Sequence, residues 1–317
     1  MPKIRLGISA CLLGEPVRFD GGHRWDRLIT DTLGKYVEFV PVCPEVECGL
    51  GAPREAMRLV GDPEAPRLVT VRTKVDLTDR LVTWARKRVG ELEQEDLCGF
   101  IFKSKSPSSG MERVRVYPEP AQGSPVTRGV GMFARIFMER FPLLPAAEEG
   151  RLHDPVLREN FIQRLFVLQR WRELLAAKPN LGDLVAFHTR HQLLILAHSP
   201  KHYRELGRLV ARAQEVPVQE LYERYQSRLM EALRLKTTAK KNTNVLSHLL
   251  RYFKKDLTPD EKQELQEIIH HYHQGYAPLA APITLINHYV RKYNQPHLKG
   301  QFYLHPHPVE LQLRNHA

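Results

Sequence analysis

The chain has 317 residues, of which 42% are hydrophobic. This length is too great for one small hydrophobic core and favours two domains. No apolar stretch approaches the ~18 residues that a membrane-spanning helix needs, and no secretory signal precedes the first cysteine. We therefore expect a cytoplasmic protein whose four cysteines are reduced and free to bind metal.

The net charge of +11 is divided unevenly along the chain. Residues 1–150 hold 22 Lys and Arg against 21 Asp and Glu, whereas residues 151–317 hold 25 against 15. A nearly neutral half joined to a strongly basic half indicates that the second half binds a polyanion, most often a nucleic acid. The alternative is a solvated basic surface without a partner.

The first half alternates between strand and helix patterns. We expect strands at 4–10, 37–43, 68–71 and 99–103, and helices at 25–35, at 77–92 and from 129–132 through Phe141. This order predicts an α/β domain with an open, mainly parallel sheet. In such sheets ligands bind beyond the carboxyl ends of the strands.

From Pro155 onward the apolar residues recur at helical spacing. The first helix has an apolar face from Leu157 to Leu175, and further helices are expected near 181–197, 201–213, 217–235, 242–253, 259–273 and 279–293. The second half is therefore predicted to be all-α. We place the domains at 1–150 and 151–317.

Three of the four cysteines follow predicted strands at the same edge of the sheet. Cys11 follows the first strand, and Cys43 and Cys48 follow the second. Cys98 precedes the third strand, roughly 20 Å from the opposite end, and is expected to be a buried apolar residue. Three thiolates can bind zinc or an iron–sulfur cluster with one open iron, although three unrelated buried cysteines would give the same spacing.

Ordered motifs in both halves resemble known families. In the first half they are Ser9-Ala10-Cys11-Leu12-Leu13-Gly14, Arg18-Phe19-Asp20-Gly21, Cys43-Pro44-Glu45, Gly49-Leu50, Pro53-Arg54 and Ser106-Pro107-Ser108-Ser109-Gly110, which together resemble the TudS-type thiouracil desulfidases. In the second half they are Phe187-His188-x-x-His191, Leu196-Ala197-His198-Ser199-Pro200, the run from Lys241 to His248, and Ala280-Ala281-Pro282-Ile283, which resemble the YbgA-type helical domain. The two domains in this order resemble the RudS-type desulfidases, a family that removes sulfur from 4-thiouridine in tRNA.

The resemblance implies a [4Fe-4S] cluster with three cysteine ligands and one open iron. Cys11 and Cys43 match two of the family's ligand positions, but the third is Ser109 in this chain. The positions of the strand ends instead nominate Cys48 as the third ligand, with Cys98 as the alternative.

The resemblance also implies a desulfidase reaction without net redox change. A thiocarbonyl sulfur is soft and would bind the open iron, so that water can add to the ring carbon. Glu45, two residues from Cys43, is expected to move protons as a general base or acid, unless it merely pairs with Arg18 or Arg54. Ser106 is expected to orient the substrate, unless it only shapes the turn.

The candidate RNA-binding residues of the second half form one basic cluster. They are Lys236, Lys240, Lys241, Arg251, Lys254 and Lys255. Lysine and arginine neutralise phosphates, which favours RNA binding here. Arg204, Arg208 and Arg212 form a second cationic stripe, for which a solvated helix face is the preferred interpretation. For His188, His191 and His198 we prefer helix packing over metal binding.

We therefore expect an iron–sulfur enzyme that acts on 4-thiouridine in tRNA. One alternative is a desulfidase for free thiouracil or thiolated nucleotides. The other is an iron–sulfur regulator that binds nucleic acid without turnover.

Overall fold

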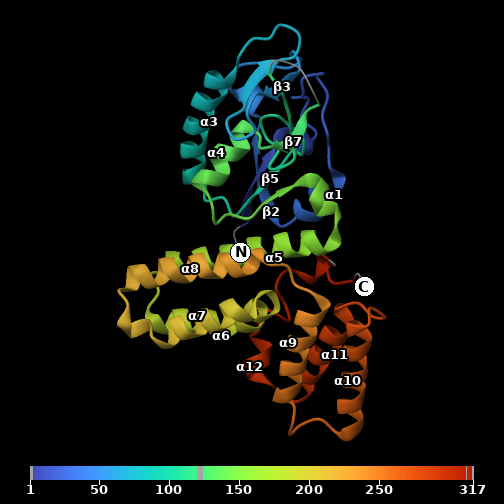
Figure 1. Ribbon diagram of the computed structural model, residues 1–317. Helices are drawn as coiled ribbons and strands as arrows, with labels where there is room; N and C mark the ends of the chain where they lie inside the picture. The colour runs from blue at the N-terminus through green and yellow to red at the C-terminus, as the bar shows by residue number, and fades with distance from the viewer. Residues whose placement is uncertain (1–2, 120–123, 312, 316–317) are drawn as a thin grey trace. The chain divides into compact units, whose positions relative to one another are not determined.

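The computed structural model describes residues 3–119, 124–311 and 313–315 of the chain (Figure 1). The chain divides into two compact units, Met1–Asp154 and Pro155–Ala317. The division lies a few residues after the boundary expected at 150. Each unit is described separately.

The first unit contains a fully parallel sheet. Its strands are β1 (Ile4–Ser9), β2 (Val37–Val42), β5 (Phe100–Phe102) and β8 (Ala146–Glu148), in the order β2-β1-β5-β8. Gly7 of β1 pairs with Phe100 of β5, and a Cβ on this glycine would lie 2.3 Å from the Phe100 ring. A glycine is therefore required where the two central strands meet.

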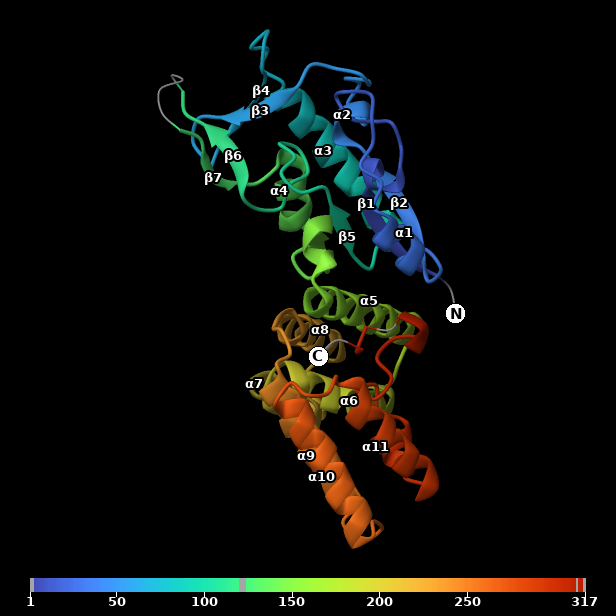
Figure 2. The same cartoon turned by 90° about the vertical axis from the view of Figure 1, so that its right-hand side faces the viewer.

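A second sheet, which the sequence predicted only in part, lies in the same unit (Figure 2). Its strands are β3 (Met57–Val60), β4 (Arg67–Thr70), β6 (Val114–Tyr117) and β7 (Val126–Gly129), in the order β4-β3-β6-β7. The outer pairs are antiparallel and the central pair is parallel. The strand expected at 68–71 is β4 of this sheet, and the other three strands were not predicted.

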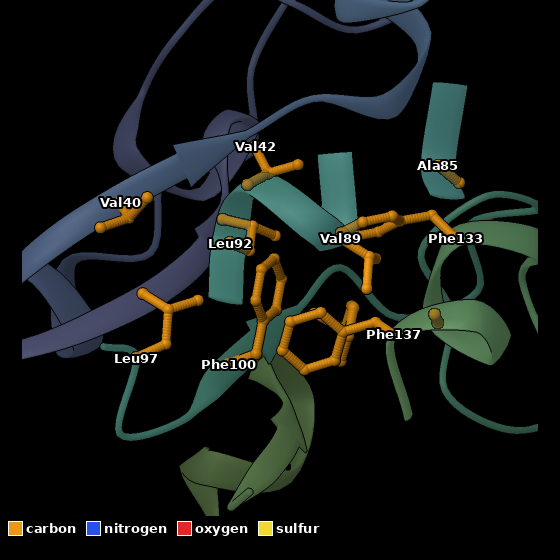
Figure 3. Close-up of a cluster of buried hydrophobic side chains, with 11 residues drawn as sticks. Val40, Val42, Ala85, Val89, Leu92, Leu97, Phe100, Phe133 and Phe137 are labelled. Carbon is orange, nitrogen blue, oxygen red and sulfur yellow. The ribbon is translucent and has the colours of Figure 1, made fainter. Parts of the chain in front are cut away.

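The helices of the first unit are α1 (Arg27–Leu33), α2 (Pro44–Glu47), α3 (Thr78–Leu92) and α4 (Met132–Arg140). Figure 3 shows the core in which Val89 of α3 and Phe137 of α4 approach Phe100 of β5. The Phe100 and Phe137 ring centroids are 4.8 Å apart. This aromatic packing fixes α4 beside the strand that leads into the serine loop described below.

The second unit is helical, which confirms the predicted fold class. Its helices are α5 (Pro155–Ala176), α6 (Leu181–His198), α7 (Pro200–Ala211), α8 (Val218–Arg234), α9 (Ala239–Tyr252), α10 (Pro259–His273), α11 (Ala280–Lys292) and α12 (Pro296–Lys299). Capping boxes at Asn180 and Thr258 explain why α6 and α10 begin where they do. Within the described residues, none of the helices has the length and apolar character needed to cross a membrane.

Candidate active site

The carboxyl ends of β1, β2 and β5 open into a cavity of about 410 Å³. Because these strands are parallel neighbours, the loops that follow them meet at one edge of the sheet. The lining residues are Ser9, Ala10, Cys11, Val17, Arg18, Phe19, Arg24, Val42, Cys43, Pro44, Glu45, Arg54, Ala56, Met57, Lys103, Ser104, Lys105, Ser106, Pro107 and Ser109. Cys11, Cys43, Glu45 and Ser106, which come from three separate loops, are thus brought together.

Cys11 lies in a single 3₁₀ turn, Ala10–Leu13, directly after β1. The turn ends at Gly14, whose φ of 94° is a left-handed conformation that glycine adopts readily. Burial raises the pKa of the Cys11 thiol to about 11, although the Lys103 ammonium acts in the opposite direction. The thiol is therefore protonated at neutral pH, and a metal must displace its proton to bind.

Cys43 is the residue before α2, and its backbone N–H donates to the Glu47 carboxylate at 2.8 Å. Burial, with the Glu45 carboxylate as a second cause, raises the pKa of the Cys43 thiol to about 12. The thiol lies 3.5 Å from Glu45 Oε2, to which it donates. A metal ligand and a candidate proton carrier are therefore direct neighbours.

The other two thiols do not reach the cavity. Cys48 caps the far end of α2, and its Sγ donates to the Glu45 carbonyl at 3.3 Å while the side chain packs against the hydrophobic cluster of the second sheet. Cys43 and Cys48 lie at opposite ends of α2, and their side chains have different surroundings. The expected convergence of Cys48 with Cys11 and Cys43 is therefore not observed. Cys98 is fully buried before β5, as expected.

Glu45 is a buried residue of the cavity lining. Its Oε2 lies 3.5 Å from the Arg54 guanidinium, and its Oε1 accepts a hydrogen bond of 2.6 Å from the Ser108 hydroxyl. Arg18 instead pairs with Asp20. Of the two ion pairs considered from the sequence, the one with Arg54 forms, and it leaves Glu45 among the residues that line the cavity.

The loop after β5 supplies the hydroxyl groups of the site. Ser106 and Ser109 line the cavity, whereas Ser108 is fully buried and is not among the lining residues. The Ser106 oxygen accepts from the backbone N–H groups of Ser108 and Ser109 at 3.3 and 3.2 Å, so this serine also shapes the turn. Sequence reasoning did not identify Ser108, whose partner Glu45 lies 63 positions away along the chain.

Basic side chains surround the cavity. Lys103 is held by the Glu149 carboxylate, which also accepts from the Ser104 backbone N–H at 2.6 Å. Among the described residues, the side chains of Arg24 and Lys105 have no hydrogen-bond or ion-pair partner, and both are exposed. The cavity therefore offers free positive charge to an anionic ligand.

The cavity contains sulfur and oxygen atoms of the kind that bind iron. Two thiols, Cys11 and Cys43, share the cavity with the Ser109 hydroxyl, which the sequence resemblance places at the third ligand position. Within the described part of the chain, no three His, Cys, Asp or Glu side chains are grouped closely enough for a single metal ion. The groups of the cavity that could contact an iron–sulfur cluster are therefore two thiols and neighbouring oxygen donors.

The predicted RNA-binding residues of the second unit have different surroundings. Lys236 precedes α9, Lys240 is its second residue and Arg251 lies near its end, and all three are exposed. Lys254 and Lys255 follow α9 and are also exposed. Lys241 differs, because its ammonium donates to the carbonyls of His198 and Lys236, each at 2.7 Å. Lys241 therefore has a structural role between two segments.

The buried histidines of the second unit make packing contacts, as preferred from the sequence. His188 Nδ1 lies 3.0 Å from the Tyr225 hydroxyl, and His191 Nδ1 lies 2.7 Å from the Phe187 carbonyl. His198 Nδ1 lies 2.7 Å from the Leu235 carbonyl. Each of the three buried histidines therefore has a hydrogen-bond partner within the helical unit.

Comparison with known proteins identifies both units. Residues 6–149 match the family described as 2-thiouracil desulfurase, and residues 192–308 match DUF1722, a family of proteins of unknown function. The solved structure of a [4Fe-4S]-dependent thiouracil desulfidase, TudS, is 27% identical over 48% of this chain and 95% of that chain, with a TM-score of 0.40. The chain is 33% identical over 153 residues to the uncharacterized protein YbgA of Escherichia coli (strain K12), covering 48% of this chain and 90% of YbgA.

The first unit is thus a domain of the 2-thiouracil desulfurase type, followed by a helical domain of the DUF1722 type. The chain belongs to the YbgA family.

Proposed function

We propose that the chain is an iron–sulfur-dependent desulfidase that converts 4-thiouridine in tRNA to uridine and sulfide, as in the RudS-type desulfidases. The observation that carries this proposal is the convergence of Cys11, Cys43, Glu45 and Ser106 in one cavity at the edge of a parallel sheet. The match of residues 6–149 to the 2-thiouracil desulfurase family supports sulfur removal from a thiouracil ring.

The cofactor of the proposal is a [4Fe-4S] cluster held by Cys11 and Cys43. The name of the TudS structure describes that protein as [4Fe-4S]-dependent. A cluster with an open iron supplies a Lewis acid that polarises the thiocarbonyl of the substrate. Cys48 stays a prediction for the third ligand, but its position outside the cavity lining favours Ser109.

The side chains of the cavity account for the proton movements. Glu45 is positioned by Arg54 and takes a proton from the water that adds to the ring carbon, and it later returns a proton to the leaving sulfur or the ring. Ser106 lines the same cavity and orients the ring with its hydroxyl. Hydrolysis of this kind needs no net electron transfer.

Two groups of free cations support a phosphate-bearing substrate over a free base. Arg24 and Lys105 line the cavity and would pair with the phosphate of a nucleotide. A free base carries no phosphate with which they could pair. In the second unit Lys240 and Arg251 lie on the exposed face of α9, about 16 Å apart along the helix axis. Such spacing suits contacts to several phosphates of an RNA backbone.

The test is anaerobic reconstitution with iron quantified per chain, followed by sulfide release from three substrates. We expect sulfide from tRNA that contains 4-thiouridine, with kcat/KM at least about tenfold above that for 4-thiouridine monophosphate or 4-thiouracil. Equal or higher efficiency on the small substrates would favour a desulfidase of free bases or nucleotides. Tight tRNA binding without sulfide release would favour a regulator.

RNA binding is tested separately from turnover. Lys240→Glu combined with Arg251→Glu should weaken tRNA binding by at least about tenfold and reduce its salt dependence. The matched control is Arg204→Glu with Arg208→Glu on α7, which changes the net charge equally and should leave the affinity within about threefold. An equal loss in both double variants would show that overall charge, and not the α9 cluster, attracts the RNA.

A further inference from the structure

Ser108 is a buried hydroxyl that joins two groups of the cavity without lining the cavity itself. It is fully buried, its Oγ donates to Glu45 Oε1 at 2.6 Å, and it lies 2.9 Å from Ser106 Oγ. We propose that Ser108 is a positioning residue that holds the Glu45 carboxylate in its orientation for proton transfer and is itself oriented by Ser106. This inference rests on the proposed desulfidase function.

The hydrogen bonds of Ser106, Ser108 and Glu45 run in one direction. An ionised carboxylate can only accept, so the single Ser108 hydroxyl proton points to Glu45. Ser108 Oγ is then available as an acceptor, and the Ser106 hydroxyl donates to it across 2.9 Å. Ser109 Oγ, at 3.3 Å from Ser108 Oγ, makes a longer contact. The shortest chain therefore runs from Ser106 through Ser108 to Glu45.

The backbone of Ser108 is held in place by the start of α4. Its carbonyl accepts from the N–H groups of Phe133 and Ala134 at 2.9 and 3.1 Å. A Cβ on Gly131 would lie 2.5 to 2.7 Å from the backbone of Ser108 and Ser109, so glycine permits this close approach. The hydroxyl is consequently presented from a rigid segment, as a group that orients a carboxylate must be.

Ser106 does not carry the proton of the attacking water. Its oxygen already accepts from two backbone N–H groups and its hydroxyl donates to Ser108, so no lone pair is left for a proton from water. A water in the cavity therefore gives its proton directly to the Glu45 carboxylate that Ser108 holds in place. The water becomes hydroxide and Glu45 becomes a neutral acid. Glu45 also lines the cavity, so it can return that proton to the leaving sulfur.

The hydrogen bonds of Ser106 show that the Ser108 hydroxyl is not needed to form the turn. Ser106 shapes the turn through its bonds to two backbone N–H groups, and these bonds do not need the Ser108 hydroxyl. Removal of the Ser108 hydroxyl should therefore leave the loop folded while breaking the link to Glu45. Substrate binding should change little, because Ser108 does not line the cavity.

The kinetic test uses Ser108→Ala in anaerobically reconstituted, full-length protein. We expect kcat to fall by about 10- to 100-fold, with KM within about twofold and with iron content unchanged. In a Glu45→Gln background, Ser108→Ala should have no further effect, because the two groups act as one unit. Ser108→Thr, which keeps a hydroxyl on the same carbon, should recover most of the rate.

Infrared spectroscopy tests the hydrogen bond between Ser108 and Glu45 in the absence of turnover. The carboxylate stretch of Glu45, identified by its loss in Glu45→Gln, should shift in Ser108→Ala but not in Ser108→Thr. An unshifted band, an unchanged kcat in Ser108→Ala, or fully additive effects with Glu45→Gln would overturn the role of Ser108. A wild-type protein that releases no sulfide from any thiolated substrate, with the band shift present, would instead overturn the proposed function and leave the positioning contact standing.

Discussion

The Arg54 guanidinium lies 3.5 Å from the Glu45 carboxylate, and only about a tenth of either side chain is exposed. Arg54 also donates to the carbonyls of Val17 and Gly51 at 2.9 and 2.8 Å. A single side chain thus fixes the candidate proton carrier and the two loops on either side of it. Breaking such a pair leaves a nearly buried carboxylate without its counter-ion.

Arg54→Gln should therefore lower the free energy of unfolding by about 2 kcal/mol. Glu45→Gln in the same background should recover part of this loss, because the uncompensated charge is removed. Chemical denaturation of the single and double variants measures both effects. Strictly additive costs would mean that Arg54 stabilises the loops only through Val17 and Gly51.

Glu45→Gln should separate catalysis from cofactor binding. The amide keeps the shape of the side chain but cannot take up a proton, so sulfide release should fall by at least about 100-fold while the iron content stays constant. Glu47→Gln is the matched control on the same turn, because Glu47 lies outside the cavity lining and its amide oxygen can still accept from the Cys43 N–H. Turnover near the wild-type rate in Glu45→Gln would exclude Glu45 from the chemistry.

Iron content should distinguish the cysteines by their position. Cys11→Ala and Cys43→Ala should abolish stable iron and acid-labile sulfide, whereas Cys48→Ala and Cys98→Ala should retain both, because the latter thiols lie outside the cavity. Ser109→Cys should raise the iron content of reconstituted protein, since thiolate binds iron more strongly than a hydroxyl does. Loss of iron in Cys48→Ala would restore Cys48 as the third ligand.

The parts of the site that follow strand order could be predicted from the sequence. Cys11 and Cys43 were expected to lie together because each follows a strand of one parallel sheet, and the carboxyl ends of such strands share an edge. The same reasoning placed Cys48 at this edge, but Cys48 is not among the residues that line the cavity. Its distance from Cys43 suggested one loop, but the intervening residues form a helical turn that carries Cys48 to the second sheet.

The missed features depend on contacts between distant segments. Strands β3, β6 and β7 have four residues each, too few for a clear alternating pattern, and they are stabilised by pairing with one another and with β4. Ser108 lies in a recognised motif, but its role depends on Glu45 and on the start of α4. The local sequence pattern gives no indication of such contacts.

Lys241 should matter for stability and not for RNA binding. Its ammonium donates to the carbonyls of His198 and Lys236, and burial lowers the pKa of this lysine. Lys241→Met should lower the free energy of unfolding by about 1 to 2 kcal/mol, because it leaves two carbonyl groups without their donor. Lys240→Met, on the exposed side of the same turn, should leave stability unchanged and weaken tRNA binding. Comparable tRNA affinity losses in both variants would return Lys241 to the RNA-binding set.

Acid should destabilise the helical unit through His188. Burial lowers the pKa of His188 from its ordinary 6.5 to about 4, so the folded state keeps the ring neutral. Between these two pH values the unfolded state binds a proton that the folded state does not, and the free energy of unfolding falls as the pH is lowered through that window. The full loss is about 3 kcal/mol for this one histidine.

His188→Gln, which can still reach the Tyr225 hydroxyl but cannot titrate, should be less stable than wild type at pH 7 and should lose less stability between pH 6.5 and 4. Denaturation curves across that range measure the difference, and identical pH slopes in the two proteins would show that His188 is not a source of the acid sensitivity.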